Sequence, residues 1–337
     1  MKYIFLSLVL FSTISFSVSA QDTTSLTTPP TGTAPAGTPA ETTVPRPVVK
    51  LIKTPAALGI SPKTQKRIAA MATPPINLAL FAVDRRDKNQ EGNSDVIMII
   101  TIDQVTKKIK MSSIMRDTYV NIEGKGMDKI NAAFAFGGPQ LAIKTINQNF
   151  DMDIQDYINV DFFGTAKMID ALGGVEINVK PEEIPYLNNY LKEISIIENI
   201  PPVNVTNPGI QVLNGRQTVA YTRIRAVGRG DYERTERQRT VLIALFNKMK
   251  GAGPALYPVF MNQILPNMET SLSGMNLFKI GGDLLNSKSK TIEQARFPLD
   301  SSSKGIRVNN IWYLSADLKV TTAALHNFIY KSISPAR

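Results

Sequence analysis

Apolar runs of strand length alternate with helix-forming segments along most of this chain, and this alternation constrains the fold more than any other feature. "PPINLALFAVD" and "SDVIMIITID" predict two strands, and "KKIKMSSIMRD" alternates between apolar and polar residues as a third. Downstream, "DYINVDF" and "GGVEINV" predict strands on either side of the helix "GTAKMIDAL". Strands that alternate with helices are typical of an α/β domain. With 337 residues, the chain is long enough for one large domain with a substantial core.

The N-terminal part has a different composition. Residues 1–20 consist of a lysine, an apolar run and a small-residue "VSA" site, which predicts either a cleaved signal peptide or a retained membrane anchor. Residues 21–50 are rich in Thr and Pro and predict a disordered linker. Residues 51–75 are expected to be transitional, and residues 76–337 to form the folded domain. With either alternative, the folded domain is expected to lie outside the cytoplasm. It would be secreted, periplasmic or held at the outer face of the cytoplasmic membrane.

Three further segments of the domain have sequence patterns that predict their structure. Residues 181–209 are polar and contain prolines, and they predict a long excursion that forms a lid or an ordered loop. Residues 232–249 and 318–331 predict helices, and the latter helix closes the domain.

The overall charge and the rare residue types limit the classes of function. The net charge is +10, so an anionic partner is expected, and nucleic acid, anionic lipid and anionic glycopolymer all qualify. The chain has no cysteine, which excludes disulfides, thiolate metal sites and cysteine nucleophiles. Its one histidine, His326, is expected to be a packing or surface residue, so histidine-based catalysis is not expected.

The first three predicted strands bring polar residues to one edge if they form an antiparallel meander. Asp84 ends the first strand, Asp95 begins the second, and the third returns to deliver Arg116 and Asp117. Two carboxylates without nearby histidine or cysteine suit Mg²⁺, with Mn²⁺ as an alternative, because a hard cation prefers oxygen ligands and shares them with phosphate. The alternative interpretation is that these carboxylates are solvated or cap the strand ends.

An arginine-rich segment, "YTRIRAVGRGDYERTERQRT" at residues 221–240, contains six arginines and no lysine. On a helix from residue 232, Arg234 and Gln238 fall on the apolar stripe that must face the core, where a desolvated arginine needs an anion. Arg223 and Arg225 share one face if their segment is extended and diverge if it is helical. A solvated basic face is expected for Arg237 and Arg239.

Arginine pairs with phosphate through two parallel hydrogen bonds and keeps its charge when buried. An arginine cluster beside a metal-binding carboxylate pair therefore predicts a pyrophosphate site. The sequence contains no GxxxxGK[ST] loop, so this is not a Walker-type nucleotide site.

Four ordered blocks resemble the LytR–CpsA–Psr (LCP) family of bacterial cell-wall enzymes, over the chain from about Ile76 to the C-terminus. The blocks are "SDVIMIITID", "SSIMRDTYVNIEGKGMDKINAAFAFGGPQLAIKTI", "YINVDFFGTAKMIDALGGVEINV" and "LNGRQTVAYTRIR…GDYERTERQR". The resemblance implies an α/β/α sandwich with a central mixed sheet and an apolar groove for a polyprenyl chain. It also implies a Mg²⁺-dependent phosphotransferase that attaches a glycopolymer from a polyprenyl-pyrophosphate carrier to peptidoglycan at the membrane surface.

The resemblance also implies roles for individual residues. Asp84 and Asp95 would bind the metal. The resemblance does not assign the general base: Asp117 or Asp231 could serve, and the alternative for Asp117 is to hold the "RDT" turn. The residues expected to hold the pyrophosphate are Arg86, Arg116, Lys129, Arg223, Arg225, Arg234 and Gln238, of which Arg116, Arg223 and Arg225 are also expected, with Asp117, to be catalytic. Asn93 departs from the family pattern, which has arginine there, so one phosphate contact is lost unless Arg86 replaces it. Met115 stands where the family has proline.

Two alternatives share these residues. One is a hydrolase that releases polyprenyl phosphate when water attacks, and the other is a non-catalytic protein that binds polyprenyl pyrophosphate or wall glycan. A nucleic-acid partner is not expected, because the chain carries an export signal and its arginines are not interleaved with aromatic residues.

Overall fold

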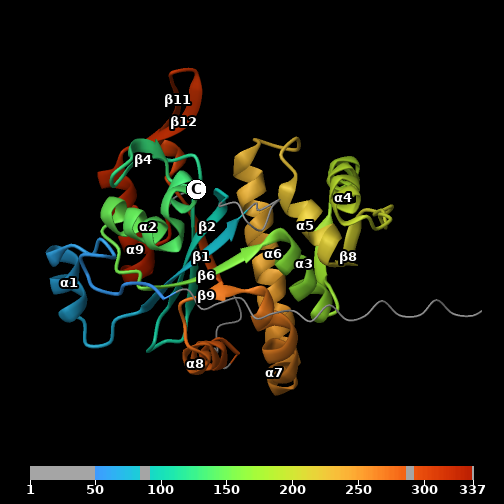
Figure 1. The fold of residues 1–337 in the computed structure, drawn as a ribbon, viewed down its shortest axis with the longest axis horizontal. Coiled ribbons are helices and arrows are strands. Elements are labelled where there is room, and N and C mark those ends of the chain that lie inside the picture. The colour runs from blue at the N-terminus through green and yellow to red at the C-terminus, as the bar shows by residue number, and fades with distance from the viewer. Residues whose placement is uncertain (1–49, 84–91, 286–291, 336–337) are drawn as a thin grey trace, which may run out of the picture. The chain divides into compact units, whose positions relative to one another are not determined.

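The first three strands pair as the antiparallel meander that the sequence predicts, at the centre of a mixed sheet (Figure 1). The computed structural model describes residues 50–83, 92–285 and 292–335. The predicted signal peptide or anchor, most of the predicted linker, and the predicted site residues Asp84 and Arg86 lie outside these ranges.

The central sheet has the strand order β10-β3-β2-β1-β6-β9. β1 pairs antiparallel with β2 and parallel with β6, and β3 pairs antiparallel with β2 and parallel with β10. This register aligns Val83 at the end of β1 with Ser94 on one side and Asp161 on the other. The strands are β1 (Ile76–Val83), β2 (Ser94–Ile102), β3 (Ile109–Ile114), β6 (Asp156–Asp161), β9 (Glu269–Thr270) and β10 (Glu293–Phe297).

Helices cover both faces of this sheet because its strands are apolar on both sides. Phe81 and its neighbours in β1 pack against α2 (Ala132–Phe150) and α9 (Leu318–Lys331), where Phe81 and Phe134 make an edge-to-face contact with ring centroids 5.2 Å apart. On the other face, Leu78 packs against α8 (Gly274–Leu285). The structure confirms the predicted α/β/α arrangement, while the apolar groove stays a prediction.

A second cluster of elements extends the domain beyond the end of β6. Its core is formed by buried side chains of α3 (Phe162–Ala171), α5 (Gly215–Arg223), α6 (Asp231–Ala252) and a two-stranded sheet. The remaining described elements are α1 (Pro62–Ala69), α4 (Ile184–Glu198), α7 (Leu256–Val259), β4 (Tyr119–Ile122), β5 (Gly126–Lys129), β7 (Val175–Val179), β8 (Gly209–Leu213), β11 (Ser303–Val308) and β12 (Ile311–Ala316), with short 3₁₀ or π turns at residues 181–183, 253–255, 260–267 and 300–302.

Two sequence expectations about order need correction. Ordered structure begins before the first strand, because Leu58 and Ile60 are buried in the core and α1 follows them. The predicted lid or loop at residues 181–209 is in part a helix, α4, whose Leu187, Leu191 and Ile194 are spaced to bury one face.

Arg237 lies in the core rather than on the solvated basic face that the sequence predicts. It is 5% exposed, its Nε donates to Glu183 Oε1 at 2.8 Å, and its terminal nitrogens donate to the carbonyls of Ile224 and Val227. Arg239 is only half-buried, and its Nε donates to Gln294 Oε1 at 2.9 Å. Arg237 therefore ties α6 to the start of α4 and to the loop after α5.

None of the helices within the described ranges combines the length with the apolar character needed to cross a bilayer.

Replacing Arg237 with methionine should lower the free energy of unfolding by about 3–5 kcal/mol, because it leaves the Glu183 carboxylate, 2% exposed, without its guanidinium. Urea denaturation measures this change. The control is Arg229→Met, which removes a guanidinium that is 69% exposed and should change the free energy of unfolding far less. Equal, small effects of the two substitutions would contradict the structural role of Arg237.

His326 is a packing residue, as its sequence context predicts, and it gives the domain a pH-dependent stability. Its Nε2 lies 2.9 Å from the Phe150 carbonyl oxygen and its Nδ1 3.0 Å from a terminal nitrogen of Arg67. The ring must be neutral, with Nε2–H donating to the carbonyl and Nδ1 accepting from the guanidinium. Burial, followed by the charge of Arg67, lowers the pKa of His326 to about 4.

Stability should therefore fall as the pH is lowered from about 6.5 to 4, because the unfolded state binds a proton there that the folded state does not. The midpoint of thermal unfolding, followed by circular dichroism across that range, measures the effect. In His326→Gln this part of the pH dependence should disappear, while the titration of carboxylates at lower pH remains. An unchanged slope between pH 6.5 and 4 in that variant would contradict the assignment.

Candidate active site

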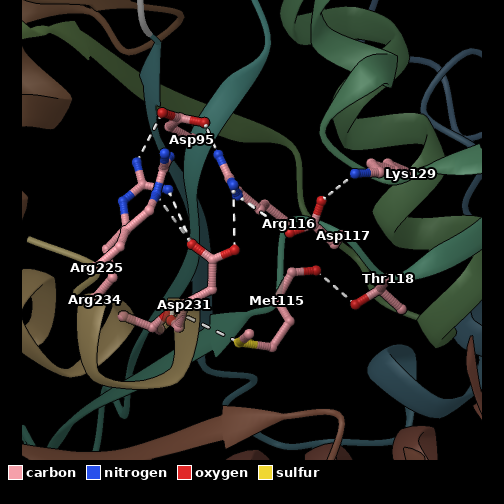
Figure 2. Close-up of polar contacts among 10 residues, drawn as sticks. Asp95, Met115, Arg116, Asp117, Thr118, Lys129, Arg225, Asp231 and Arg234 are labelled. Carbon is pink, nitrogen blue, oxygen red and sulfur yellow. Dashed lines mark hydrogen bonds and ion pairs between the residues drawn. The ribbon is translucent and has the colours of Figure 1, made fainter. Parts of the chain in front are cut away.

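Asp95 and Arg116 meet at one edge of the central sheet, as the meander predicts (Figure 2). Asp95 is the second residue of β2, and Arg116 follows β3 by two positions. Arg116 Nη1 donates to Asp95 Oδ1 at 2.6 Å, and Arg234 Nη2, from the first turns of α6, donates to Asp95 Oδ2 at 2.7 Å. One carboxylate therefore holds two guanidinium groups that come from distant parts of the chain.

Asp231 is a second carboxylate among the same arginines. It is the first residue of α6 and follows a loop in which Gly228 and Gly230 have positive φ, a turn that glycine adopts without strain. Its Oδ2 lies 3.2 Å from Arg116 Nη2, and its Oδ1 lies 3.4 Å from Arg225 Nε and 3.6 Å from Arg234 Nη1. Figure 2 shows this carboxylate lying between the three guanidinium groups.

Lys129 and Asp117 extend the network on the other side of Arg116. Asp117 is 3% exposed, and its carboxylate lies 3.3 Å from Arg116 Nε and 2.7 Å from Lys129 Nζ. Lys129 is brought there by the β4–β5 hairpin, which the sequence patterns did not predict, and the adjoining Asn131 N–H donates to the Arg116 carbonyl at 3.2 Å.

Asp95, Asp231 and the arginines around them are charged in the folded protein. Burial alone would raise the pKa of Asp95, but the charges and hydrogen bonds of Arg234 and Arg116 outweigh it and hold that pKa below its usual value. The same balance lowers the pKa of Asp231, where burial is opposed by Arg116, Arg234 and Arg225. The pKa of Arg116 is raised because three carboxylates outweigh its burial. Burial lowers the pKa of Arg234, but arginine is not deprotonated in proteins, so both guanidinium groups stay charged.

The network keeps hydrogen-bonding capacity for a further anion. Four cations, Arg116, Lys129, Arg225 and Arg234, face the three carboxylates, so the cluster has an excess positive charge. The Nε atom of Arg234 is buried and has no hydrogen-bond partner among the described residues, while Arg116 Nε has only the Asp117 carboxylate at 3.3 Å. A buried N–H without an acceptor is unfavourable, and an incoming phosphate oxygen would satisfy it.

Gln238 lies beside this network, as its helical position predicts. It lines a small pocket together with Asp95, Arg116, Asp231 and Arg234, and the pocket floor is apolar and includes Met98 and Ile114. Gln238 and Arg234 are both largely buried, which agrees with their place on the core-facing stripe of α6.

Arg223 and Arg225 do not share one face, so the extended-segment interpretation is wrong. Arg223 is the last residue of α5 and pairs with Glu193 at 3.4 Å, with its guanidinium carbon 5.7 Å and 5.0 Å from the ring centroids of Phe162 and Tyr190. Phe162 immediately follows β6, two strands from Asp95, which places Arg223 near the same edge of the sheet, about 10 Å along it.

Four further positions, Asp84, Arg86, Asn93 and Asp231, carry expectations from the sequence. Asp84 and Arg86 fall outside the described residues, so their predicted roles stay predictions. Asn93, which replaces the usual family arginine, is exposed just before β2. The sequence predicts Asp231 only as a possible general base. Its position at a helix start after "GRG" also indicates a carboxylate at the positive end of a helix.

The donor set can be compared with what a magnesium site needs. Within the described ranges, no group of three or more Asp, Glu or His side chains is close enough to hold a metal ion. Asp95 is anionic, and each of its oxygens keeps a lone pair beyond the one used by arginine. Because Mg²⁺ is commonly held by one or two carboxylates and completed by substrate phosphates, Asp95 fits as one ligand of such a site.

Comparison with known proteins identifies the family of this chain. The family model of the LytR_cpsA_psr family matches residues 52–327. Polyisoprenyl-teichoic acid–peptidoglycan teichoic acid transferase TagU of Bacillus subtilis is 30% identical over 262 residues, which are 76% of this chain and 78% of TagU. Among solved structures, B. subtilis TagV is 26% identical with a TM-score of 0.63, covering 79% of this chain and all of TagV.

TagT with bound octaprenyl pyrophosphate lipid has the same fold, with a TM-score of 0.61 at 23% identity over 83% of this chain and 99% of that one. The meander, the mixed sheet and the arginine cluster thus occur in a chain matched by the family model over most of its length. This protein belongs to the LytR_cpsA_psr family.

Proposed function

We propose that this protein transfers a glycopolymer from a polyprenyl-pyrophosphate carrier to peptidoglycan. The observation that supports this most directly is the pair of guanidinium groups, Arg116 and Arg234, that share Asp95, with the buried Nε–H of Arg234 left without an acceptor among the described residues. A relative named as a teichoic acid transferase and a neighbour with bound octaprenyl pyrophosphate support the reaction and its donor.

The arginines bind and orient the pyrophosphate. Arg116 and Arg234 donate to its oxygens from positions fixed by Asp95, so little reorganisation is needed as charge develops on the leaving polyprenyl phosphate. Arg225 is more exposed, at 46%, and contacts the side of the diphosphate that faces solvent. Lys129 holds Asp117 and adds a positive charge behind Arg116.

Asp231 is better placed than Asp117 to accept the proton of the attacking sugar hydroxyl. The Asp117 carboxylate is buried and engaged by both Lys129 and Arg116, which suits a positioning role. Asp231 is 25% exposed, and its carboxylate lies 3.2 to 3.6 Å from three arginines, a looser arrangement than the 2.7 Å pair of Asp117 with Lys129. A general base must reach the proton that it removes, and Asp231 is the more exposed of the two carboxylates, at 25% against 5% for Asp117.

Asp95, together with Asp84, is the proposed holder of Mg²⁺, with Mn²⁺ as an alternative. When bound, such an ion neutralises charge on phosphate oxygens and supports departure of the polyprenyl phosphate. The excess positive charge of the cluster disfavours a divalent cation without the diphosphate. We therefore expect metal affinity to be weak in the free protein and to rise when the lipid substrate is bound.

The predicted export signal and a donor carried on a membrane lipid support a reaction outside the cytoplasm at the membrane surface. The described domain carries the polar site, and residues 1–20 supply secretion or anchoring in this proposal. Hydrolysis of the same donor and binding without turnover remain the two alternatives, because they require the same arginines.

Purified full-length protein, incubated with a polyprenyl-pyrophosphate-linked oligosaccharide, peptidoglycan fragments and Mg²⁺, should yield a phosphodiester-linked product and polyprenyl monophosphate. Mass spectrometry identifies both, and chelation of the metal should abolish the product until Mg²⁺ is restored. Polyprenyl monophosphate with free phosphorylated glycan would identify a hydrolase. Unchanged substrates would leave only the binding protein and contradict the transferase.

Arg116→Gln should weaken binding of geranyl pyrophosphate, a short-chain analogue of the donor, by about tenfold to a hundredfold, because a charged hydrogen bond is lost. Isothermal titration calorimetry in the presence of Mg²⁺ measures the affinity. Arg229→Gln is the matched control, because Arg229 lies near the same helix start but is 69% exposed and pairs with Glu233 and Asp300. If both variants bind the diphosphate as the parent protein does, Arg116 is not a ligand.

A further inference from the structure

The β11–β12 hairpin stands out because it projects away from the sheet and helices (Figure 1). Its strands pair in regular antiparallel register from Ser303 with Ala316 to Val308 with Ile311. The connecting Asn309 and Asn310 both have positive φ, which is the geometry of a tight two-residue hairpin turn. A tight turn and full pairing make this projection a rigid arm.

The base of the hairpin is joined to the candidate active site. Leu314 N–H donates to the Asp117 carbonyl at 2.9 Å, and Leu314 also bridges to Thr118. Lys129 Nζ, which pairs with the Asp117 carboxylate, lies 5.8 Å from the ring centroid of Tyr313. The base of the hairpin therefore joins the segment that holds Asp117, while Tyr313 meets Lys129 from the hairpin face opposite to that of its neighbour Trp312.

One face of the hairpin presents a flat aromatic ring. Residues that pair directly share a face, so Trp312 and Arg307 lie side by side and Gly305 follows on the same face. A Cβ atom at Gly305 would come within 2.7 Å of Trp312 Nε1, so the indole rests against the glycine backbone. Trp312 is still 39% exposed, which leaves part of the ring open to solvent.

The charged side chains of the hairpin are all positive. Residues 303–316 contain Lys304 and Arg307 and no acidic residue. Arg307 donates to the Asn310 carbonyl at 3.3 Å, which holds its guanidinium near the tip. An aromatic ring lying flat beside an arginine suits a ligand that combines a sugar ring, for stacking, with carboxylates, for pairing.

We infer that the Gly305–Arg307–Trp312 face of this hairpin binds the acceptor, a glycan strand whose peptide stems carry carboxylates, and delivers it to the edge of the site beside Asp117. The inference rests on the proposed transferase function. The hairpin is favoured as the acceptor surface because it is rigid, positively charged and continuous with the site, while the arginine cluster is occupied by the donor.

Trp312 is the only tryptophan in the chain, so its fluorescence reports directly on this face. Titration of the full-length protein with soluble glycan strands bearing peptide stems should shift or quench the emission to saturation. Uncharged chito-oligosaccharides should bind more weakly, and anionic lipid vesicles should leave the emission unchanged. An unchanged emission with the glycan strands, or a shift with vesicles alone, would overturn the inference, the latter in favour of a membrane contact.

Kinetics separate the acceptor surface from the reaction itself. Trp312→Leu and Arg307→Gln should each raise the KM for the peptidoglycan acceptor about tenfold, while the affinity for geranyl pyrophosphate stays unchanged. Trp312→Phe should restore most of the acceptor affinity, and Lys304→Gln, on the opposite face, is the matched control.

An unchanged acceptor KM in both hairpin variants overturns the inference but leaves the transferase standing. Saturable fluorescence without any transfer would instead support the hairpin and count against the transferase.

Discussion

Two guanidinium groups, one buried and one partly buried, share one carboxylate at the edge of the sheet, and the candidate site depends on this arrangement. Arg116 and Arg234 reach Asp95 at 2.6 Å and 2.7 Å, from segments that are 21 and 139 residues away from it in sequence. Arg234 is 3% exposed, and an arginine in such a place is unfavourable without an anion. Asp95 supplies part of that compensation, and the remaining capacity of both arginines points to a second anion.

The rest of the fold keeps these groups in position. The meander fixes Asp95 against Arg116 through strand register, and α6 places Asp231, Arg234 and Gln238 on one stripe. Arg237, on another side of the same helix, is anchored to Glu183 and two backbone carbonyls. Rigid placement of this kind allows positive charge to stabilise a developing negative charge without reorganisation at the moment of reaction.

The parts predicted from sequence are those that depend on periodicity and strand length. Strand lengths were enough to place Asp95 and Arg116 at one edge, because successive antiparallel strands must return to it. The 3.6-residue period was enough to place Arg234 and Gln238 toward the core. Asp84 and Arg86 stay predictions, since they lie outside the described residues.

The parts that sequence could not predict depend on partners far along the chain. Arg237 looks solvated on a helical wheel because its partner Glu183 is 54 residues away and belongs to a segment predicted as a loop. Arg223 and Arg225 diverge because α5 ends between them, and a helix end is a boundary that periodicity places poorly. The β4–β5 hairpin that positions Lys129 is short and half exposed, and it leaves too weak a pattern to identify.

A crystal structure of the protein soaked with geranyl pyrophosphate and Mg²⁺ would test most directly whether the guanidinium cluster holds a diphosphate. The expected result is a diphosphate within hydrogen-bond distance of the Nε and terminal nitrogens of Arg116 and Arg234, with Asp95 still between them and Asp231 facing the outer phosphate. A diphosphate bound elsewhere, with the ion pairs of Asp95 and Asp231 as they are in the free protein, would contradict the proposed role of the cluster.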